Sequence, residues 1–395
     1  MIQRTRSSTP LMLLPFVVMT GCIDAPSQPT LALPAVTAHF DAVKFWDVTA
    51  STLWNARAIA LAGQRPPANA QAAVSRILTY LSLAQYRAVL AAEDGKIKST
   101  HPSVAAAVGA ASASVLGAFF PLDVTAIEAQ LSADIATPGW PGADHQDVPS
   151  GAAIGRAVGS AVLALAASDN YLVLSPGLPP VGPGFWIANG PPVRSLYGVR
   201  PFFLTSRDQL RPPPPPAYGS AAFLAALAEV RAISDTRTAA QLASAQFWNT
   251  AVAPFTTGFL NLIADTLIRD HHRTEEEAAR ILAYANAAAF DAQIACFDAK
   301  YTYWLIRPSQ ADPLITLPIG LPNHPSHPSA HACITSAIMT VLIDAFPSER
   351  DRLNGIIEAS GLSRIYGGLH YRFDVEAGQT IGRRAAALSR AGSLE

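Results

Sequence analysis

Apolar residues recur at intervals of three and four along most of this chain, a spacing that predicts helices and few strands. The clearest helix start is a capping box at Thr274 and Glu277, followed by an apolar stripe at helical spacing. The same spacing predicts helices at about residues 36–63, 69–92, 102–118, 122–136, 150–168, 220–232, 237–266, 274–306, 328–346, 349–360 and 374–391. We therefore expect an all-α protein.

A Pro/Gly-rich segment, residues 174–219, separates two helical stretches of the chain at residues 36–173 and 220–395. It is too long and too rich in proline for regular structure, so it either wraps the helical body or is a disordered linker. It also carries aromatic residues, including Phe185 and Trp186. These favour the wrapping interpretation, because aromatic side chains gain from burial.

The N-terminus has the features of a secretion signal. Two arginines precede an apolar run from Leu11 to Met19, which is too short to span a bilayer but suits a signal-peptide core. The sequence Met19-Thr20-Gly21-Cys22 resembles a bacterial lipoprotein cleavage box. We expect residues 1–22 to be the signal, Cys22 to carry lipid and residues 23–35 to be a tether. A plain secretory signal without a lipid is the alternative. The lipoprotein interpretation predicts a periplasmic or cell-surface protein that is anchored to a bacterial membrane.

The composition gives no sign of a nucleic-acid partner. The chain has 395 residues, of which 50% are hydrophobic and 14% charged, with a formal net charge of −1. A nucleic-acid-binding protein is expected to carry an excess of basic residues, which this chain lacks. Charges, Gly and Pro interrupt the Ala-rich stretches, so we expect no membrane span beyond the signal. Cys296 and Cys333 could form a disulfide in an oxidising compartment or remain buried thiols. The sequence leaves that choice and the oligomeric state open.

The first of three chemical motifs is Lys300-x6-Arg307-Pro308. If the helix continues past Lys300, seven residues are almost two turns, so the two cations share a face about 10 Å apart along the axis. Pro308 would end the element. Two like charges on one face repel unless an anion or carboxylate lies between them. The alternative is a solvated edge with extended Lys and Arg side chains.

The second motif, Pro328-Ser329-Ala330-His331, precedes an apolar helical run. Proline suits the first turn of a helix. The free N–H groups of Ser329 and Ala330 would then point out of the helix start, where the dipole favours an anion. Three histidines lie within residues 323–331. A Pro-rich loop with imidazoles capping the backbone explains one of them more easily than all three.

The third motif is Ser363-Arg364-x5-His370-x3-Asp374, after a predicted helix end at Gly361. His370 and Asp374 are four residues apart and would share a face on a helix. A carboxylate there can hold one imidazole nitrogen as a donor and leave the other free to attack or ligate. An ordinary surface pair is the alternative interpretation.

Together the motifs provide the groups that a tetrahedral oxyanion such as phosphate or vanadate needs. Lys300, Arg307 and Arg364 would neutralise its oxygens, and Ser329 with the N–H of Ala330 would add hydrogen bonds.

The three motifs resemble the signature of the type 2 phosphatidic acid phosphatase and vanadium haloperoxidase superfamily: Lys-x6-Arg-Pro, Pro-Ser-Gly-His and Ser-Arg-x5-His-x3-Asp. Here 19 residues separate Pro308 from Pro328, and 31 separate His331 from Ser363. One position departs from the signature, because Ala330 replaces its glycine. Glycine tolerates positive φ and close approach of the backbone to an anion, which alanine does at a cost.

Other segments look like the bacterial haloperoxidase-like branch of this superfamily over roughly residues 36–391. Examples are Gly182 to Trp186 and Ala295 to Trp304, although Phe297 stands where a tryptophan is frequent. The resemblance implies two helical bundles, residues 36–173 and 220–395, with the site in the second.

The resemblance also implies roles for the histidines. His370, oriented by Asp374, would supply the axial nitrogen, either to the vanadium of vanadate or to phosphorus. His331 would be the opposite acid or base. Bromide-oxidising members are similar to this chain in carrying a histidine at the position of His324, where chloride-oxidising members carry an aromatic residue.

Three functions follow from the resemblance, in this order. The first is a vanadium-dependent haloperoxidase-like enzyme that uses hydrogen peroxide, a halide and a small organic substrate. The second is a periplasmic acid phosphatase that cleaves a phosphoester through a phosphohistidine. The third is an inactive lipoprotein that binds an anion or a partner.

Overall fold

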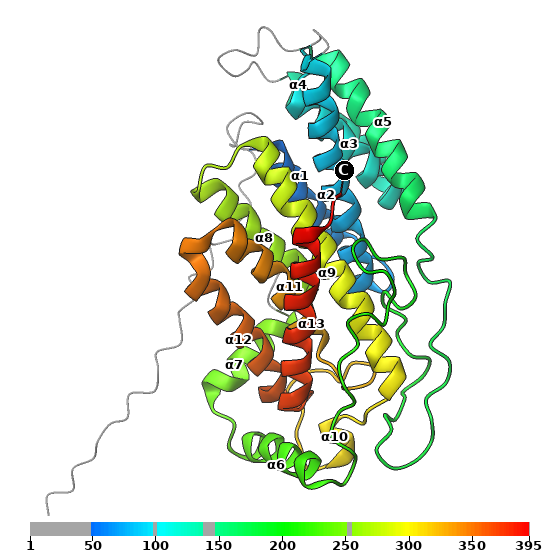
Figure 1. Cartoon of the computed structure of the whole chain (residues 1–395), viewed down its shortest axis with the longest axis vertical. Coiled ribbons are helices and arrows are strands. Elements are labelled where there is room, and N and C mark those ends of the chain that lie inside the picture. Colours follow the sequence, from blue (N-terminus) through cyan, green and yellow to red (C-terminus); the bar gives the residue numbers. More distant parts are fainter. Residues whose placement is uncertain (1–48, 98–100, 137–146, 251–254, 395) are drawn as a thin grey trace, which may run out of the picture. The chain divides into compact units, whose positions relative to one another are not determined.

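Helices make up the regular structure of the described chain apart from isolated bridges, and the all-α prediction is confirmed (Figure 1). The computed structural model describes residues 49–97, 101–136, 147–250 and 255–394. The signal at 1–22, the lipid site at Cys22, the tether at 23–35 and the predicted helix start at residue 36 lie outside these residues.

The helices follow the predicted order with shifted ends. The N-terminal helices are α1 (Ala50–Gln64), α2 (Ala70–Ile97), α3 (Val104–Phe119), α4 (Val124–Ala136) and α5 (Val148–Ala167). The later helices are α6 (Ala221–Thr236), α7 (Ala239–Thr250), α8 (Phe255–Asp270), α9 (Glu275–Tyr303), α10 (Pro308–Ala311), α11 (Ala330–Ala345), α12 (Arg350–Tyr366) and α13 (Arg372–Ala391). The single helix expected at 237–266 is thus two helices, α7 and α8.

Helix α9 runs through the interior and carries the first motif. It starts at the predicted capping box, where the Thr274 side chain accepts from the N–H of Glu277 and the Glu277 side chain accepts in return. It is buried along most of its length and packs against α2, α11 and α13. The largest apolar cluster joins α9 to α1–α5. The described residues all belong to one compact unit, and the boundary between two bundles stays a prediction.

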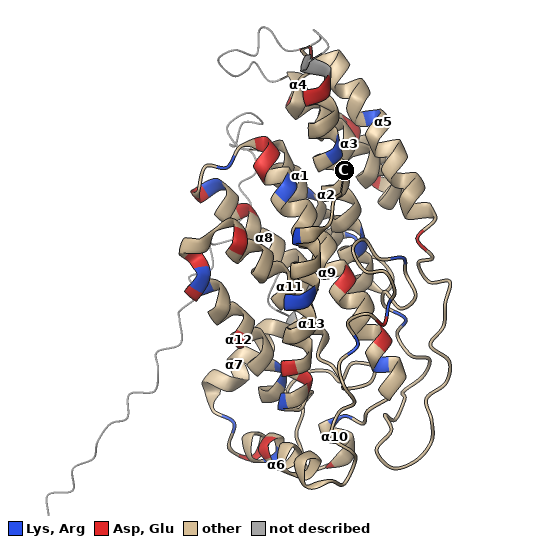
Figure 2. Cartoon of the chain, viewed as in Figure 1, with Lys and Arg blue, Asp and Glu red and all other residues tan. Residues whose placement is uncertain are grey.

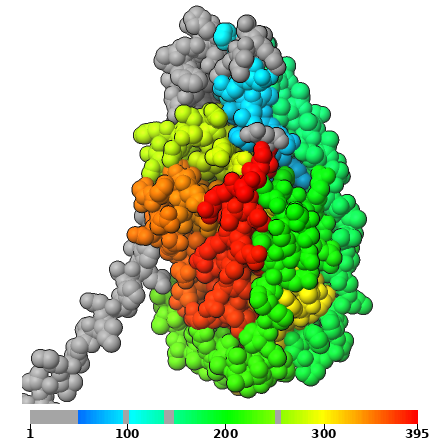
Figure 3. Space-filling model, viewed as in Figure 1, coloured from blue at the N-terminus to red at the C-terminus, as the bar shows by residue number. Residues whose placement is uncertain are grey.

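The Pro/Gly-rich segment lies along α9 and is fixed to it by polar side chains (Figure 1). The Asp291 carboxylate accepts the N–H groups of residues 202–204 at 2.6–3.0 Å. About two helical turns further along α9, Asp298 pairs with Arg207 at 3.2 Å and with Arg211 at 2.7 Å. In the space-filling view the segment, in green, forms surface beside the red α13 (Figure 3). Two residues of the same segment, Val193 and Ser195, line the pocket described below.

Replacing Asp291 by alanine should destabilise the fold. Burial raises the pKa of Asp291 to about 6, so at pH 8 the side chain is a carboxylate that accepts three N–H groups. Without it these buried donors lose their acceptor, which should cost roughly 3 kcal/mol. Thermal unfolding at pH 8 would measure this as a fall in Tm, with the exposed Glu276→Ala as the control from the same helix. Equal Tm values for the two variants would contradict the anchoring role of Asp291.

Helix α5 is long and apolar enough to span a membrane, whereas we expected no such segment beyond the signal from the sequence. Its length and hydropathy suffice for a span, although core helices of soluble proteins share those properties. Its glycines lie against α3 so closely that a Cβ at Gly155 would be 2.1 Å from the Ala107 carbonyl oxygen. Its Arg156 pairs with Glu128 of α4. The helix is therefore tied to two neighbours within the described chain.

Candidate active site

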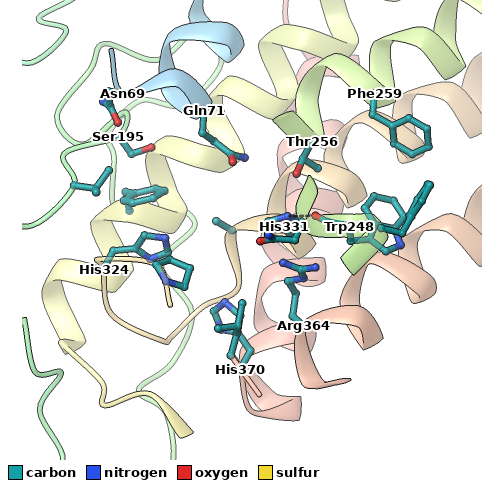
Figure 4. Close-up of a pocket in the computed structure, with 17 residues that line it drawn as sticks. Asn69, Gln71, Ser195, Trp248, Thr256, Phe259, His324, His331, Arg364 and His370 are labelled. Atoms are coloured by element: carbon teal, nitrogen blue, oxygen red, sulfur yellow. Dashed lines mark hydrogen bonds between the residues drawn. The ribbon is translucent and has the colours of Figure 1, made fainter. Parts of the chain in front are cut away.

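A pocket of about 260 Å³ is lined by residues of the second and third motifs (Figure 4). Predicted site residues line it from three directions: His324, Ala330, His331, Arg364 and His370. The other predicted residues, Lys300, Arg307, Ser329 and Asp374, are fully buried and do not line the pocket. Arg307 and Asp374 bond to His370 of the pocket wall, Lys300 bonds to Pro325 beside His324, and Ser329 precedes Ala330 in the chain. The structure thus gathers every predicted site residue at one place.

The path of the first motif differs from the prediction, because Lys300 and Arg307 do not share a helix. Helix α9 ends at Tyr303, and Trp304 adopts a left-handed conformation with φ 51°. Residues 304–306 then pair with the Pro/Gly-rich segment: the Trp186 N–H donates to the Trp304 carbonyl at 2.7 Å. Arg307 is extended and Pro308 begins α10 rather than ending a helix. A tertiary contact therefore overrides the local helical pattern.

Both cations of this motif are turned inward and bound by backbone carbonyls. Lys300 Nζ donates to the carbonyl oxygens of Pro325 at 2.7 Å and Ser326 at 2.9 Å. The Arg307 guanidinium donates to the carbonyl of His324 at 2.9 and 3.0 Å and to that of Leu369 at 2.8 Å. The loop that follows α10 is thereby fixed around the two charges.

The third cation comes from α12. Arg364 donates to the Ser363 hydroxyl at 3.0 Å and to the Ala245 carbonyl at 3.1 Å. The helix end predicted at Gly361 is wrong, since α12 continues to Tyr366. The glycine serves close packing instead, because a Cβ there would lie 2.5 Å from Val375 Cγ1 of α13.

These three cations are buried without an ionic partner in the described chain. Charged residues are sparse along the ribbon (Figure 2), yet Lys300, Arg307 and Arg364 meet here, none within ion-pair distance of a carboxylate among the described residues. Burial lowers the pKa of Lys300 to about 8, that of Arg307 to about 10 and that of Arg364 to about 9. A buried cation is costly unless an anion compensates it. The arrangement therefore favours a bound anion.

The second motif begins α11, with two differences from the prediction. Pro328 precedes the helix instead of entering its first turn, and the Ser329 N–H is not free, because it donates to the Asp374 carbonyl at 2.9 Å. Ala330 is the first helical residue and has no positive φ, so the conformational cost expected for replacing glycine does not arise. Its N–H has no intrahelical acceptor at that position. The Ser329 hydroxyl is buried and has no partner among the described residues.

His370 and Asp374 meet as predicted, but not on one helix face. His370 precedes α13 and Asp374 lies in its first turn, where it also accepts the Tyr371 N–H at 3.1 Å. His370 Nδ1 is 3.1 Å from Asp374 Oδ2. Burial alone would raise the pKa of Asp374, but hydrogen bonds from His327 and His370 outweigh it and lower the pKa. Asp374 is therefore a carboxylate that accepts from His370.

The second ring nitrogen of His370 is directed at the cations. With the proton on Nδ1, Nε2 carries a lone pair, and Arg307 Nη1 lies 3.1 Å from it. Burial, followed by the charge of Arg307, lowers the pKa of His370 well below its usual value. The ring is neutral and can act as a nucleophile or as a ligand through Nε2.

His331 has a different support. Its Nε2 lies 3.1 Å from the carbonyl oxygen of Trp248, so this nitrogen carries the proton and Nδ1 is left as the base. Burial, followed by the charge of Arg364, lowers the pKa of His331 well below its usual value. A carbonyl stabilises an imidazolium less than a carboxylate does. His331 is thus arranged as a neutral base.

His324 lies at the opposite wall of the pocket from these helix starts (Figure 4). Its Nδ1 is 3.0 Å from Arg307 Nη2, and its ring packs edge-on against Phe297 with 5.2 Å between centroids. Burial, followed by the charges of Lys300 and Arg307, lowers the pKa of His324 well below its usual value.

Sequence reasoning missed several residues of the site. Ser326 and His327 both donate to Asp374, at 2.6 and 3.0 Å. The histidine-rich run was the available signal for His327. Phe247, Trp248 and Phe259 form an aromatic wall with no signal in the motifs. The lining also has neutral polar residues, namely Asn69, Gln71, Ser195, Asn249 and Thr256. Among the described residues that line the pocket there is no Asp or Glu. Cys296 and Cys333 are buried free thiols beside the site.

Anion binding should weaken as pH rises through about 8. Below that pH Lys300 is protonated and attracts the anion; above it the side chain loses its charge, because burial has lowered its pKa to about 8. Sulfate is a suitable probe, since it does not titrate in this range. Calorimetry from pH 6.5 to 9.5 should show affinity falling by up to about tenfold per pH unit above 8. In Lys300→Met the affinity should be lower, and it should be flat up to about pH 8.5, below the lowered pKa of Arg364 at about 9. A wild-type profile without a slope between pH 8 and 8.5 would contradict the assignment.

Residues 279–393 match the family described as the PAP2 superfamily. No curated protein matches the chain. A solved structure described as the first bacterial vanadium-dependent iodoperoxidase is similar with a TM-score of 0.74 and 21% identity, over 87% of this chain and 96% of that one. A bacterial vanadium-dependent chloroperoxidase in its holo form is similar with a TM-score of 0.65 and 14% identity, over 84% and 94% of the two chains. The predicted resemblance is confirmed: residues 279–393 match the PAP2 superfamily, and the fold is similar to that of bacterial vanadium-dependent haloperoxidases.

Proposed function

We propose that this protein is a vanadium-dependent haloperoxidase-like enzyme that binds vanadate and oxidises a halide with hydrogen peroxide. The observation that carries the proposal is the convergence of Lys300, Arg307 and Arg364, buried without carboxylate partners in the described chain, around Nε2 of His370. A tetrahedral oxyanion would neutralise these charges and accept from their N–H groups.

The residues fit vanadate beyond their charge. The buried Ser329 hydroxyl has no partner in the described chain, and the Ala330 N–H is free at a helix start; both would donate to an oxygen. His370 Nε2 would bind the vanadium, and Asp374 would hold the His370 proton on Nδ1 so that Nε2 keeps its lone pair. When bound, vanadate would activate peroxide as a Lewis acid without changing its own oxidation state.

His331 would act as the general base in this reaction. As a neutral base with its proton on Nε2, it would accept a proton from incoming hydrogen peroxide at Nδ1. His324 would lie beside the halide, and its identity favours bromide. The aromatic and neutral polar lining of the pocket suits a small, uncharged or anionic organic substrate.

An acid phosphatase is the second candidate, because the same cations suit a phosphoryl group. His370 Nε2 would attack phosphorus and form a phosphohistidine. That reaction requires His331 to give a proton to the leaving alcohol, which a histidine with a lowered pKa and a carbonyl partner does poorly. This point, together with the described activities of the similar structures, ranks the peroxidase first. A lipoprotein that binds an anion without turnover is the third.

Two activity assays separate these candidates. Purified protein is incubated with monochlorodimedone, hydrogen peroxide and iodide, bromide or chloride, with and without vanadate; p-nitrophenyl phosphate is tested in parallel. Bromination that depends on vanadate supports the proposal. Phosphate release inhibited by vanadate, with no halogenation, would replace it with the phosphatase. A folded protein that binds vanadate and is inactive in both assays supports the third candidate.

The proposed location is the periplasm or cell surface, with a lipid on Cys22. Metabolic labelling with a palmitate analogue should mark the full chain and should fail for Cys22→Ser. Labelling of both chains, or of neither, would count against the anchor.

A further inference from the structure

We infer that His327 is a positioning residue of this site, which fixes Asp374 so that the carboxylate holds His370 in one orientation and one tautomer. The inference rests on the proposed anion site, but not on which reaction that site performs. His327 lies between the second motif's helix and the loop held by Lys300, and it has no role in the mechanism above.

The two oxygens of Asp374 have separate partners. Oδ1 accepts from His327 Nδ1 at 3.0 Å. Oδ2 accepts from His370 Nδ1 and from the Tyr371 N–H, both at 3.1 Å, and from the Ser326 hydroxyl at 2.6 Å. The donor on Oδ1 therefore fixes the rotation of the carboxylate and leaves Oδ2 to face His370.

His327 lies between aromatic rings, in a space that an apolar ring could also fill. Its side chain is buried, with Tyr303 and Phe373 at ring distances of 5.7 and 5.9 Å. Its Nε2 is buried and has no partner in the described chain. An unpaired buried acceptor costs about 1–3 kcal/mol, a cost that phenylalanine would avoid. The Nδ1–H donated to Asp374 is the function of the imidazole that phenylalanine could not replace.

Without that donor, Oδ1 would be a buried carboxylate oxygen with no partner. The carboxylate could then rotate or take up a proton, and either change would loosen its hold on the His370 Nδ1–H. His370 would lose its fixed tautomer, and Nε2 would no longer be presented to the anion as a lone pair. The residues that touch the anion would remain in place.

The test compares two substitutions at His327 in the full chain. His327→Phe removes the Nδ1–H donor and keeps an aromatic ring in its place. His327→Asn removes the ring, but its side-chain amide places an N–H near the position of Nδ1. His271→Phe is the matched control, since His271 also lies beside a carboxylate, Glu349 at 3.4 Å, outside the site. Binding of inorganic phosphate is measured by calorimetry, and the tautomer of His370 by nitrogen-15 NMR of labelled protein.

We expect His327→Phe to weaken phosphate binding by roughly tenfold, the effect of about one lost charged hydrogen bond. We also expect mixed His370 tautomers in that variant. His327→Asn should restore affinity to within about threefold and restore the single tautomer, and His271→Phe should match the wild type. Wild-type affinity and tautomer in His327→Phe would overturn the inference. So would equal losses in the Phe and Asn variants, which indicate a purely structural role.

The NMR measurement keeps this test separate from the proposed function. It reports the His370 tautomer without any anion, and so applies even if His327→Phe binds nothing. Failure of the wild-type protein to bind phosphate or vanadate would count against the anion site itself. A wild type that binds phosphate but shows His370 protonated on Nε2 would contradict only the positioning by Asp374 and His327.

Discussion

Replacement of His370 by alanine is expected to abolish halide oxidation, with a loss of about 10³-fold or more in kcat/KM, within the range seen for a side chain that takes part in the chemistry. His370 offers a lone pair at Nε2 while Asp374 accepts from its Nδ1. No other imidazole in the described pocket has this support, because His331 bonds to a carbonyl and His324 to Arg307.

The controls distinguish lost chemistry from lost folding. His272, an exposed residue outside the site, gives the matched variant His272→Ala, which should keep full activity. Phosphate should still bind to His370→Ala through the cations, with affinity reduced less than turnover. Added imidazole should restore part of the activity if it occupies the space left by the side chain. Turnover close to that of wild type in His370→Ala would refute the role given to His370.

The candidate site residues could be selected from the sequence because the motifs that contain them consist of residue types at fixed spacing. The three motifs contain the three cations, His331, His370 and Asp374, and in the structure these residues line the pocket or are buried beside its lining. The all-α fold was also predictable, since helical periodicity and the capping box at Thr274 are local signals. Such features need no knowledge of which segments meet in space.

The features that the sequence did not predict depend on tertiary contacts. Helix α9 ends at Tyr303 because residues 304–306 pair with a segment more than a hundred residues earlier, although the first local signal for a helix end is Pro308. The partner of His331 is a backbone carbonyl, which any residue at position 248 could supply. Gly361 resembles a helix terminator, yet close packing against Val375 explains it. In each case a distant neighbour outweighs local propensity.

Replacement of Arg364 by methionine should change stability and anion binding in opposite directions. In the wild-type protein without an anion, Arg364 is buried near Arg307 with no carboxylate partner, and burial lowers its pKa to about 9. Methionine removes this uncompensated charge but also removes the hydrogen bonds that Arg364 donates to the Ser363 hydroxyl and the Ala245 carbonyl. We expect the balance to stabilise the anion-free protein by about 1 kcal/mol, since removing buried ionic groups is frequently stabilising.

Addition of phosphate should reverse the order of stability, so that the wild-type protein becomes more stable than Arg364→Met. A ligand at a hundred times its Kd stabilises the folded state by about 2.7 kcal/mol, and wild type should gain this at millimolar phosphate if it binds in the micromolar range. Arg364→Met should lose about 10²-fold in affinity, as expected when one charged partner of a buried interaction is removed, and should gain little. The measurement is the Tm of both proteins with and without phosphate, with the exposed Arg390→Met as control. Equal phosphate-induced shifts in Arg364→Met and wild type would mean that Arg364 does not contact the anion, and the three-cation site would have to be reduced to Lys300 and Arg307.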